Sequence, residues 1–222
     1  KAILDDATFR REVLGELITY TTGRFLYAFN ADEHPRDLSP NYNYPAYVAF
    51  DFNVTPMTCV ISQHYGGAIY VLKEFSQDNT DIWRFCADIK PYLARYPAVY
   101  VTGDASGRNR SGLARENTNY YSVIIEELRI NERNIHTPVI NPTHVNSRVL
   151  CNSLFAKHPA LYVDYRCEGL IADIEMVQVN EKGEIVKSDP KLTHLLDCLR
   201  YYLHTYHADW LDKYVNRNKG RK

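Results

Sequence analysis

Three strand-like segments follow one another closely between residues 46 and 75, and they constrain the fold more than any other part of the chain. Their sequences are AYVAFDF, MTCVISQHY and AIYVLKEF, and each is rich in the β-branched and aromatic residues that strands favour. Tyr65-Gly66-Gly67 marks a tight hairpin turn between the second and the third segment. Connections this short predict an antiparallel meander.

Helices and further strands alternate after the meander. A helix predicted over about residues 80–95 leads through Pro97 to AVYVTGD, whose almost continuous apolar run is typical of a central parallel strand covered on both faces. Further helices are predicted over about residues 119–131, 144–157 and 191–207 and within CEGLIADIEMVQ, and short strands at HTPVI and LYVD. This order predicts an α/β fold with a ribonuclease H-like mixed sheet, in which the meander and parallel strands are flanked by helices.

The chain divides into three parts. Residues 1–45 combine the amphipathic stretch FRREVLGELITY and the aromatic GRFLYAF with a polar, proline-bearing linker, and they predict an arm separate from the main domain. Residues 46–212 form that domain, and the basic residues 213–222 predict a flexible tail. A hairpin is predicted over about 177–186, where its short polar arms have little to bury, so we expect it to project from the body.

The composition excludes several classes of protein. Of 222 residues, 45% are apolar, which is ample for a hydrophobic core. No apolar stretch approaches the roughly 20 residues of a membrane helix, and residues 1–8 lack the apolar centre of a signal peptide, so we expect no membrane association. The five cysteines never form C-x-x-C, which argues against a disulfide framework or a zinc site and favours a reducing cytoplasm.

Three aspartates are candidates for a functional site. Asp51 interrupts the apolar segment YVAFDFN, where an unpaired charge is costly, and Asp104 ends VYVTGD, at the sheet edge where ligands of α/β folds collect. Asp197 lies about 140° around the last predicted helix from the centre of its leucine stripe, so we expect it outside the core. Each also has a simpler interpretation, because Asp51 and Asp104 are turn-forming residues and Asp197 is spaced for a surface ion pair with Arg200.

If these carboxylates meet, their chemistry predicts a metal site. Clustered carboxylates repel one another unless cations intervene, and oxygen ligands suit Mg²⁺ or Mn²⁺ rather than zinc. Two such ions can activate a water and stabilise the leaving 3′ oxygen of a phosphodiester, which predicts phosphoryl transfer on nucleic acid. His194, three residues before Asp197, is a further candidate ligand or phosphate-directed donor, or else a solvent-exposed histidine.

The charge of the chain limits how it can bind nucleic acid. A formal net charge of -1 argues against strong binding by the whole chain, because nonspecific affinity comes mainly from Lys and Arg that neutralise phosphates. Arg108, Arg110 and Arg148 are nevertheless candidates for phosphate contacts. Each is equally explained as a surface residue that favours solubility.

Four segments of the sequence together resemble a known family. YVAFDFN, VTGDASG, VNSRVLCNSLF and DPKLTHLLDCLRYYL resemble the C-terminal nuclease domain of the large terminase subunit of tailed bacteriophages, a ribonuclease H-like enzyme. FRREVLGELI with GRFLYAF is similar to the segment that joins the motor domain to that nuclease, so the resemblance covers most of the chain. The chain begins with Lys1 and not with Met, and we expect it to be part of a longer protein.

The resemblance implies roles for individual residues. Asp51, Asp104 and Asp197 would hold two divalent cations, Mg²⁺ or Mn²⁺, with Asp51 between the ions and His194 close to the metal or the scissile phosphate. Asp189 is a further candidate beside the site, although its Asp-Pro pair also makes a good helix entrance. The hairpin at 177–186 resembles an auxiliary hairpin implicated in guiding DNA.

The resemblance also implies a function. It implies a metal-dependent endonuclease that cuts double-stranded concatemeric viral DNA during genome packaging, with little sequence preference, in the cytoplasm of the bacterial host. An ATPase domain, a portal protein and a small terminase subunit would be its partners in the intact protein. The chain has no G-x-x-x-x-G-K-[ST], so we expect it to cut DNA and not to pump it. The alternatives are another ribonuclease H-like enzyme, such as a resolvase or transposase, and a non-catalytic nucleic-acid adaptor of the packaging assembly.

Overall fold

The predicted meander forms the middle of the sheet in the computed structural model, which describes residues 23–53, 55–109, 118–186, 189 and 192–219. Its strands are β3 (Ala46–Asp51), β4 (Met57–Tyr65) and β5 (Ala68–Gln77). They pair antiparallel in this order, as predicted. Gly66 and Gly67 turn the chain between β4 and β5 with φ angles of 60° and 78°, which residues with a Cβ rarely adopt.

Parallel strands extend the meander on both sides. They are β6 (Val99–Gly103), β7 (Leu161–Asp164) and β2 (Pro35–Arg36). β6 pairs with β3, β7 with β5 and β2 with β7, which gives a six-stranded sheet of order β2-β7-β5-β4-β3-β6. The predicted combination of an antiparallel meander with parallel strands is therefore confirmed.

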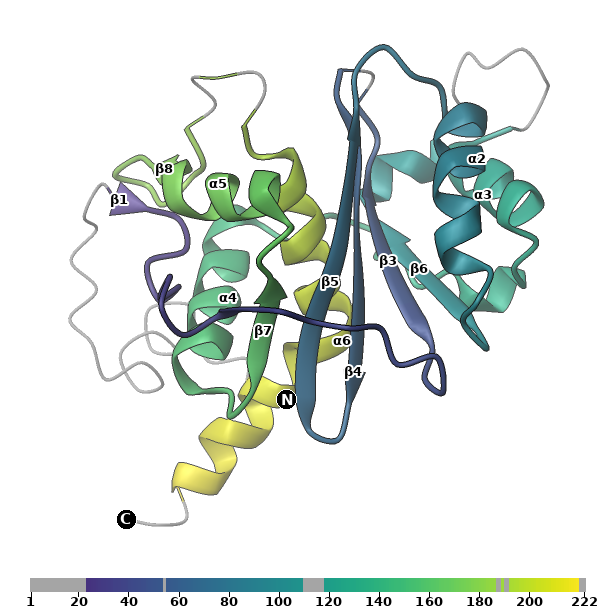
Figure 1. Ribbon diagram of the computed structural model, residues 1–222. Helices are drawn as coiled ribbons and strands as arrows, with labels where there is room; N and C mark the ends of the chain where they lie inside the picture. The colour runs from purple at the N-terminus through teal and green to yellow at the C-terminus, as the bar shows by residue number, and fades with distance from the viewer. Residues whose placement is uncertain (1–22, 54, 110–117, 187–188, 190–191, 220–222) are drawn as a thin grey trace.

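Helices cover both faces of this sheet (Figure 1). On one side lie α2 (Ile82–Leu93) and α3 (Tyr120–Leu128), and on the other α4 (His144–Lys157), α5 (Glu168–Met176) and α6 (His194–Lys219). Each layer has its own core, to which β3 contributes Val48 and Phe50 on the α2 side and Ala49 on the α6 side. Because side chains alternate along a strand, Asp51 faces α6.

The neighbourhood of β6 differs from the prediction. We expected a central strand followed by a second strand at 136–140, but β6 is the last strand of the sheet, and beyond it the described chain makes only a single parallel bridge between Val101 and Ile135. Pro138 has no N–H to donate to a neighbouring strand. Val139 and Ile140 are 89% and 80% exposed, so neither packs against the sheet.

The last helix is displaced from its predicted bounds. α6 begins at His194 and its backbone stays helical to Lys219, through seven residues of the segment for which we predicted a flexible tail. The predicted leucine stripe is buried, with Leu196, Leu199 and Leu203 fully enclosed. α6 packs against β3 and β4 on one side and against α4 and α5 on the other. Its residues 195–203 are therefore buried on every side of the helix.

The segment before β3 packs into the domain. Phe25 and Leu26 are fully buried in the α4–α6 core, and β1 (Gly23–Arg24) pairs antiparallel with β8 (Gln178–Val179). The buried Gln63 of β4 holds the following linker by donating to the carbonyls of residues 41, 44 and 45. Residues 23–45 are thus continuous with the domain rather than a separate arm, because their aromatic side chains are needed in its core. The amphipathic stretch at 9–20 lies outside the described residues.

The predicted hairpin at 177–186 forms around a turn at residues 181–183. The backbone N–H of Asn180 donates to Glu184, and that of Val186 donates to Gln178. It does not project freely from the body, because Val177, Val179 and Ile185 are at most 7% exposed and join the core beside α4 and α5. The apolar side chains of the short arms are buried in the domain, and β1 pairs with the first arm.

Two predictions from composition can be compared with the structure. All five cysteines are buried and unpaired, in agreement with the expected absence of a disulfide framework. Among the described helices none is both long enough and apolar enough to cross a membrane.

A buried aspartate fixes the start of α6. Oδ2 of Asp173, on α5, accepts hydrogen bonds from the backbone N–H groups of Leu195 and Leu196 at 3.0 and 3.1 Å. These N–H groups belong to the first turn of the helix, where they have no partner within it. Asp173 is 4% exposed, and burial raises the pKa of its carboxyl. α5 thereby sets the position of the turn that carries His194 and Asp197.

Asp173→Ala is expected to destabilise the protein by about 1–3 kcal/mol, because two buried N–H donors lose their acceptor. The measurement is urea unfolding followed by circular dichroism. Glu175→Ala, an exposed acid on the same helix, is the matched control and should change the free energy of unfolding by less than about 0.5 kcal/mol. Equal effects of the two substitutions would contradict the capping role.

Candidate metal centre

A cleft of about 820 Å³ opens at the end of the sheet where β3 and β6 finish. The three predicted aspartates all line it: Asp51 is the last residue of β3, Asp104 follows β6, and Asp197 lies in the first turn of α6. β3 and β6 are parallel neighbours, so their carboxyl ends meet at one edge. Residues far apart in the sequence are thereby brought to a single cavity.

Asp51 is the most enclosed of the three carboxylates at 3% exposure. Its Oδ2 accepts from Nδ2 of Asn53 at 2.6 Å and lies 2.9 Å from Nδ1 of His194. Burial raises the pKa of Asp51 most, the bond from His194 lowers it, and the charges of Asp197 and Asp104 raise it further, so the net shift is upward. The surroundings of Asp51 therefore disfavour the ionised form of its carboxyl group.

Asp104 is held by a loop that only small residues allow. Gly103 has a φ of 151°, and a Cβ there would collide with the carbonyl oxygen of Phe50. A Cβ on Gly107 would collide with the ring of Phe52. The GDASG loop can therefore lie directly against β3. Oδ1 of Asp104 accepts from the backbone N–H of Ser106 at 2.7 Å and caps the short helix 105–108.

A second clamp on Asp104 comes from Asn141. Its Nδ2 donates to Oδ1 of Asp104 at 2.8 Å, and its Oδ1 accepts from the N–H of Ala105 at 2.8 Å. The hydroxyl of Tyr121 donates to the Asp104 carbonyl at 2.8 Å. The turn-forming interpretation of Asp104 is thus correct for one oxygen, while the residue also lines the cleft.

Asp197 is buried, contrary to the expectation that it lies outside the core. It is 4% exposed, because α6 is enclosed by the sheet and by other helices and not by one face alone. The ion pair with Arg200 forms, with Nε 2.5 Å from Oδ1 of Asp197, but it is buried and not on the surface. Arg200 also donates to the carbonyl of Pro142 at 3.0 Å and to the hydroxyl of Tyr201 at 3.1 Å.

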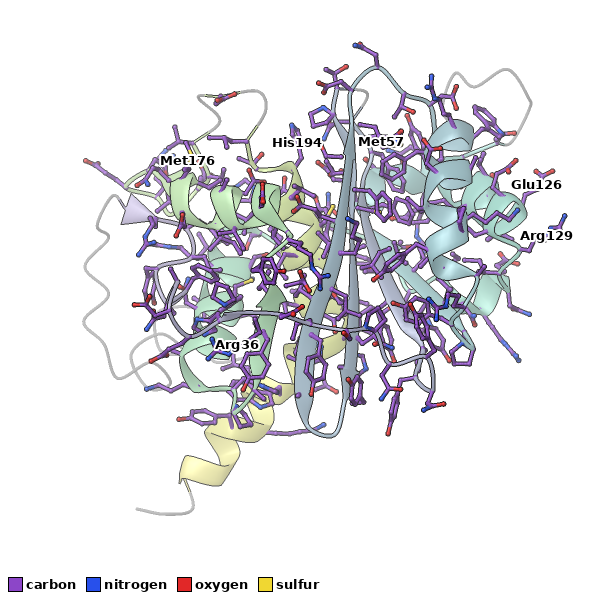
Figure 2. The ribbon with its side chains drawn as sticks, viewed as in Figure 1. Arg36, Met57, Glu126, Arg129, Met176 and His194 are labelled. Atoms are coloured by element: carbon purple, nitrogen blue, oxygen red, sulfur yellow. The ribbon has the colours of Figure 1, made fainter. Side chains whose placement is uncertain are left out.

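His194 lies beside Asp51, at the same end of the sheet as Met57 (Figure 2), and is not itself among the residues that line the cleft. Its Nδ1 is 2.9 Å both from Oδ2 of Asp51 and from Nδ2 of Asn53. Donation to the carboxylate requires a proton on Nδ1, which excludes acceptance from the amide, so Asn53 and His194 both donate to Asp51. The side chain is 13% exposed and is not the freely solvated histidine of the simpler interpretation.

The other predicted residues lie farther from the aspartates. Asp189 precedes α6 and does not line the cleft. Arg148 is directed toward the N-terminal segment, where it donates to the carbonyls of Arg24 and Phe25 at 3.2 and 3.3 Å. Arg108 is exposed on the helix that Asp104 caps and donates to Thr137. Arg110 lies outside the described residues.

Several lining residues were not predicted. Asn53, Asn141, Glu184, Arg200 and Tyr201 all face the cleft. Only two of them carried a usable signal, since Asn53 lies next to the strand of Asp51 and Arg200 is spaced for pairing with Asp197. Glu184 comes from the hairpin and Asn141 from a loop, and nothing local in the sequence connects either with the aspartates.

The fold matches solved structures of phage large terminases. A large terminase from the thermophilic bacteriophage D6E matches over 89% of this chain and 49% of its own, with a TM-score of 0.65 and 19% identity. The P22 large terminase nuclease domain matches over 84% of this chain and 93% of its own, with a TM-score of 0.64 and 14% identity. No protein-family model matches the sequence, and no curated protein matches it either.

The chain has the fold of a large terminase nuclease domain. This agrees with the ribonuclease H-like architecture and with the family that the motifs resemble. A further match, to the large terminase nuclease from thermophilic phage G20c with bound magnesium, has a TM-score of 0.50 and 12% identity over 79% of this chain and 85% of the other. The chain spans about half the length of the D6E terminase it matches.

The donor set of the cleft fits a divalent cation. Each aspartate directs one oxygen to protein donors, while Oδ1 of Asp51 and Oδ2 of Asp104 and Asp197 accept no hydrogen bond from a described residue. Within the described parts of the chain, no three His, Cys, Asp or Glu side chains are already arranged around one ion position. Arg200 pairs with Asp197 and offsets only one of the three negative charges. Hard oxygen ligands with surplus negative charge suit Mg²⁺ or Mn²⁺.

Asp51→Asn is expected to stabilise the protein at pH 7. The raised pKa of Asp51 means that its contribution to stability is present below the ordinary value of 3.8 and is lost as the pH rises through the folded-state pKa. The asparagine has no such loss, so the stability difference should grow from acid toward neutral pH. Urea unfolding in closely spaced pH steps, from below the ordinary value of 3.8 up to pH 7, measures it.

The same variant separates a metal site from a structural one. Mg²⁺ or Mn²⁺ should raise the melting temperature of the wild type and raise that of Asp51→Asn much less, because binding to the folded state adds stability. Asp209→Asn, an exposed acid on α6, is the control and should respond as the wild type does. A lower stability of Asp51→Asn at pH 7, or equal metal responses, would contradict the assignment.

Proposed function

We propose that this domain is a metal-dependent endonuclease that cuts double-stranded DNA with little sequence preference. The observation that carries the proposal is the meeting of Asp51, Asp104 and Asp197 in one cleft of a terminase-nuclease fold. Bound magnesium in the similar G20c nuclease supports a divalent cation as the cofactor. The cleft is open and lined with polar groups, as a site for a phosphodiester backbone requires.

Two divalent cations, Mg²⁺ or Mn²⁺, would supply Lewis acidity for the attacking water and for the leaving 3′ oxygen. Asp51, Asp104 and Asp197 would hold them through the oxygens that accept no protein hydrogen bond. Asp51 would lie between the ions, as the family resemblance implies, and it is close enough to the other two carboxylates for their charges to raise its pKa. The elevated pKa of Asp51 also means that a cation in the cleft relieves unfavourable charge.

The neighbouring donors would position these carboxylates. His194 and Asn53 orient Asp51, Asn141 and the N–H of Ser106 orient Asp104, and Arg200 orients Asp197. Such supporting contacts typically change metal affinity or activity by about 10–100-fold when they are removed. We propose that these residues orient the three aspartates. His194 would in addition lie close to the metal or the scissile phosphate.

The proposed setting is viral genome packaging. A large terminase combines its nuclease with other parts, and this chain covers about half of the D6E protein. We propose that an ATPase domain belongs to the intact protein and that the portal and the small terminase subunit present concatemeric DNA to it in the cytoplasm of the bacterial host. A formal net charge of -1 suits a nuclease whose DNA is delivered by an assembly.

Incubation of the domain with supercoiled plasmid tests the activity. We expect nicking and linearisation with Mn²⁺ or Mg²⁺, none with EDTA, and a loss of about 100-fold or more in Asp104→Ala, because this loss should exceed that of a supporting contact. Asp209→Ala should cut as the wild type does. Agarose gel electrophoresis of samples taken at successive times separates the supercoiled, nicked and linear forms.

Two results would refute the proposal. Unchanged plasmid at high protein concentration with either metal would favour the non-catalytic adaptor. Full activity of Asp104→Ala would mean that the cutting does not depend on this cleft. Strong sequence preference or junction-specific cutting would instead favour a resolvase or transposase type of enzyme.

A further inference from the structure

The most exposed apolar side chains among the described residues lie beside the cleft. Val139 and Ile140 are 89% and 80% exposed, well above the other large apolar side chains, of which Met176 at 56% comes next. With Pro138 they form a three-residue apolar tip, which we call the 138–140 tip. The next residues along the chain, Asn141, Pro142 and Thr143, line the cleft. The tip is therefore an extension of the cleft wall.

The tip is anchored on both sides. Before it, Thr137 accepts from Arg108 through its carbonyl at 2.9 Å and through its hydroxyl at 2.5 Å. After it, Asn141 is bonded to Asp104 and Ala105, and the Pro142 carbonyl accepts from the buried Arg200. Only three residues lie between these two anchors. The exposed side chains are thus displayed at a fixed position relative to Asp104, and they have no core of their own.

A positive charge lies at the base of the tip. Arg108 is exposed, and its hydrogen bonds to described residues both go to the neutral Thr137. No described carboxylate forms an ion pair with it. Its charge is therefore free to meet an anionic ligand. Asp104, which lines the cleft, caps the short helix that ends with Arg108, so this charge lies one short helix along the chain from a residue of the cleft.

The size of the tip limits what it can bind. A stable protein interface buries about 800 Å² on each partner, which two side chains do not approach. Apolar wedges that enter the minor groove of DNA, in contrast, consist of one or two residues such as Ile or Pro, with basic side chains on the adjacent phosphates. The tip beside Arg108 has this composition.

We propose that the 138–140 tip enters the minor groove of duplex DNA lying in the cleft, with Arg108 on a flanking phosphate. This rests on the proposed function, and it adds a way of holding DNA that does not depend on overall charge. Ile140 and Val139 part or widen the groove next to the scissile position. The duplex is thereby aligned with the aspartates although the chain is nearly neutral.

Binding measurements test the tip separately from cleavage. A short fluorescein-labelled duplex and the matching single strand are titrated with the domain at low salt, with Ca²⁺ in place of Mg²⁺. The double variant Val139→Ser/Ile140→Ser should weaken duplex binding about tenfold, because burial of these side chains is lost, and should leave single-strand binding unchanged. Both side chains are exposed, so folding should not suffer. Met176→Ser is the matched control.

Two further readouts distinguish the parts of the proposal. Arg108→Gln should lower the slope of log affinity against log salt by about 0.9, as expected for one phosphate contact, while the double variant leaves the slope unchanged. A duplex with 2-aminopurine should brighten when the wild type binds and stay dark with the double variant, because an inserted wedge unstacks bases.

The outcomes separate this inference from the proposed function. If the double variant binds duplex as the wild type does, the inference fails even where plasmid cleavage succeeds. If the plasmid stays uncut but duplex binding depends on the tip, the inference stands and the nuclease proposal fails. A wild type that does not bind duplex overturns the inference, as does a wild-type dimer in sedimentation that the double variant abolishes.

Discussion

The parallel pairing of β3 with β6 is the constraint on which the rest of the structure depends. Phe50 lies opposite Gly103, and the backbone N–H of Asp104 donates to the Phe50 carbonyl at 3.0 Å. This register brings Asp51 and Asp104 to the same edge. It requires a residue without a side chain at position 103, since a Cβ would collide with that carbonyl. Gly103 therefore allows β6 to approach β3 closely, and this approach places the Asp104 carboxylate beside Asp51.

The charged residues of the cleft lower the stability of the folded state. Burial and neighbouring charges raise the pKa of Asp51, and a buried Arg200 is needed beside Asp197. Buried charges seldom add stability, so such a cluster favours function over stability. Neighbouring hydrogen bonds offset part of this destabilisation, because Asp173 accepts from the start of α6 and Asn141 donates to the loop after β6. A divalent cation would remove much of the remaining penalty.

Much of the fold could be predicted from periodicity. The meander, α4 at His144–Lys157 and the buried leucines of α6 follow from patterns within single elements, and these predictions were correct. The predicted strand at 136–140 was wrong, because Val139 and Ile140 have apolar character without anything to pack against. The predicted separation of residues 23–45 also missed their packing, since the partners of Phe25 and Leu26 come from α4–α6, more than a hundred residues away.

The sequence by itself predicted the candidate carboxylates, the metal chemistry that suits them and most of the order of strands and helices, because these depend on residue type and local spacing. Tertiary structure alone decided that Asp197 is buried, that Glu184 and Asn141 reach the same cleft, and that Arg148 turns to the N-terminal segment. The physical reason is that α6 is enclosed from several sides. A helical wheel describes one face, whereas burial depends on every element that packs around the helix.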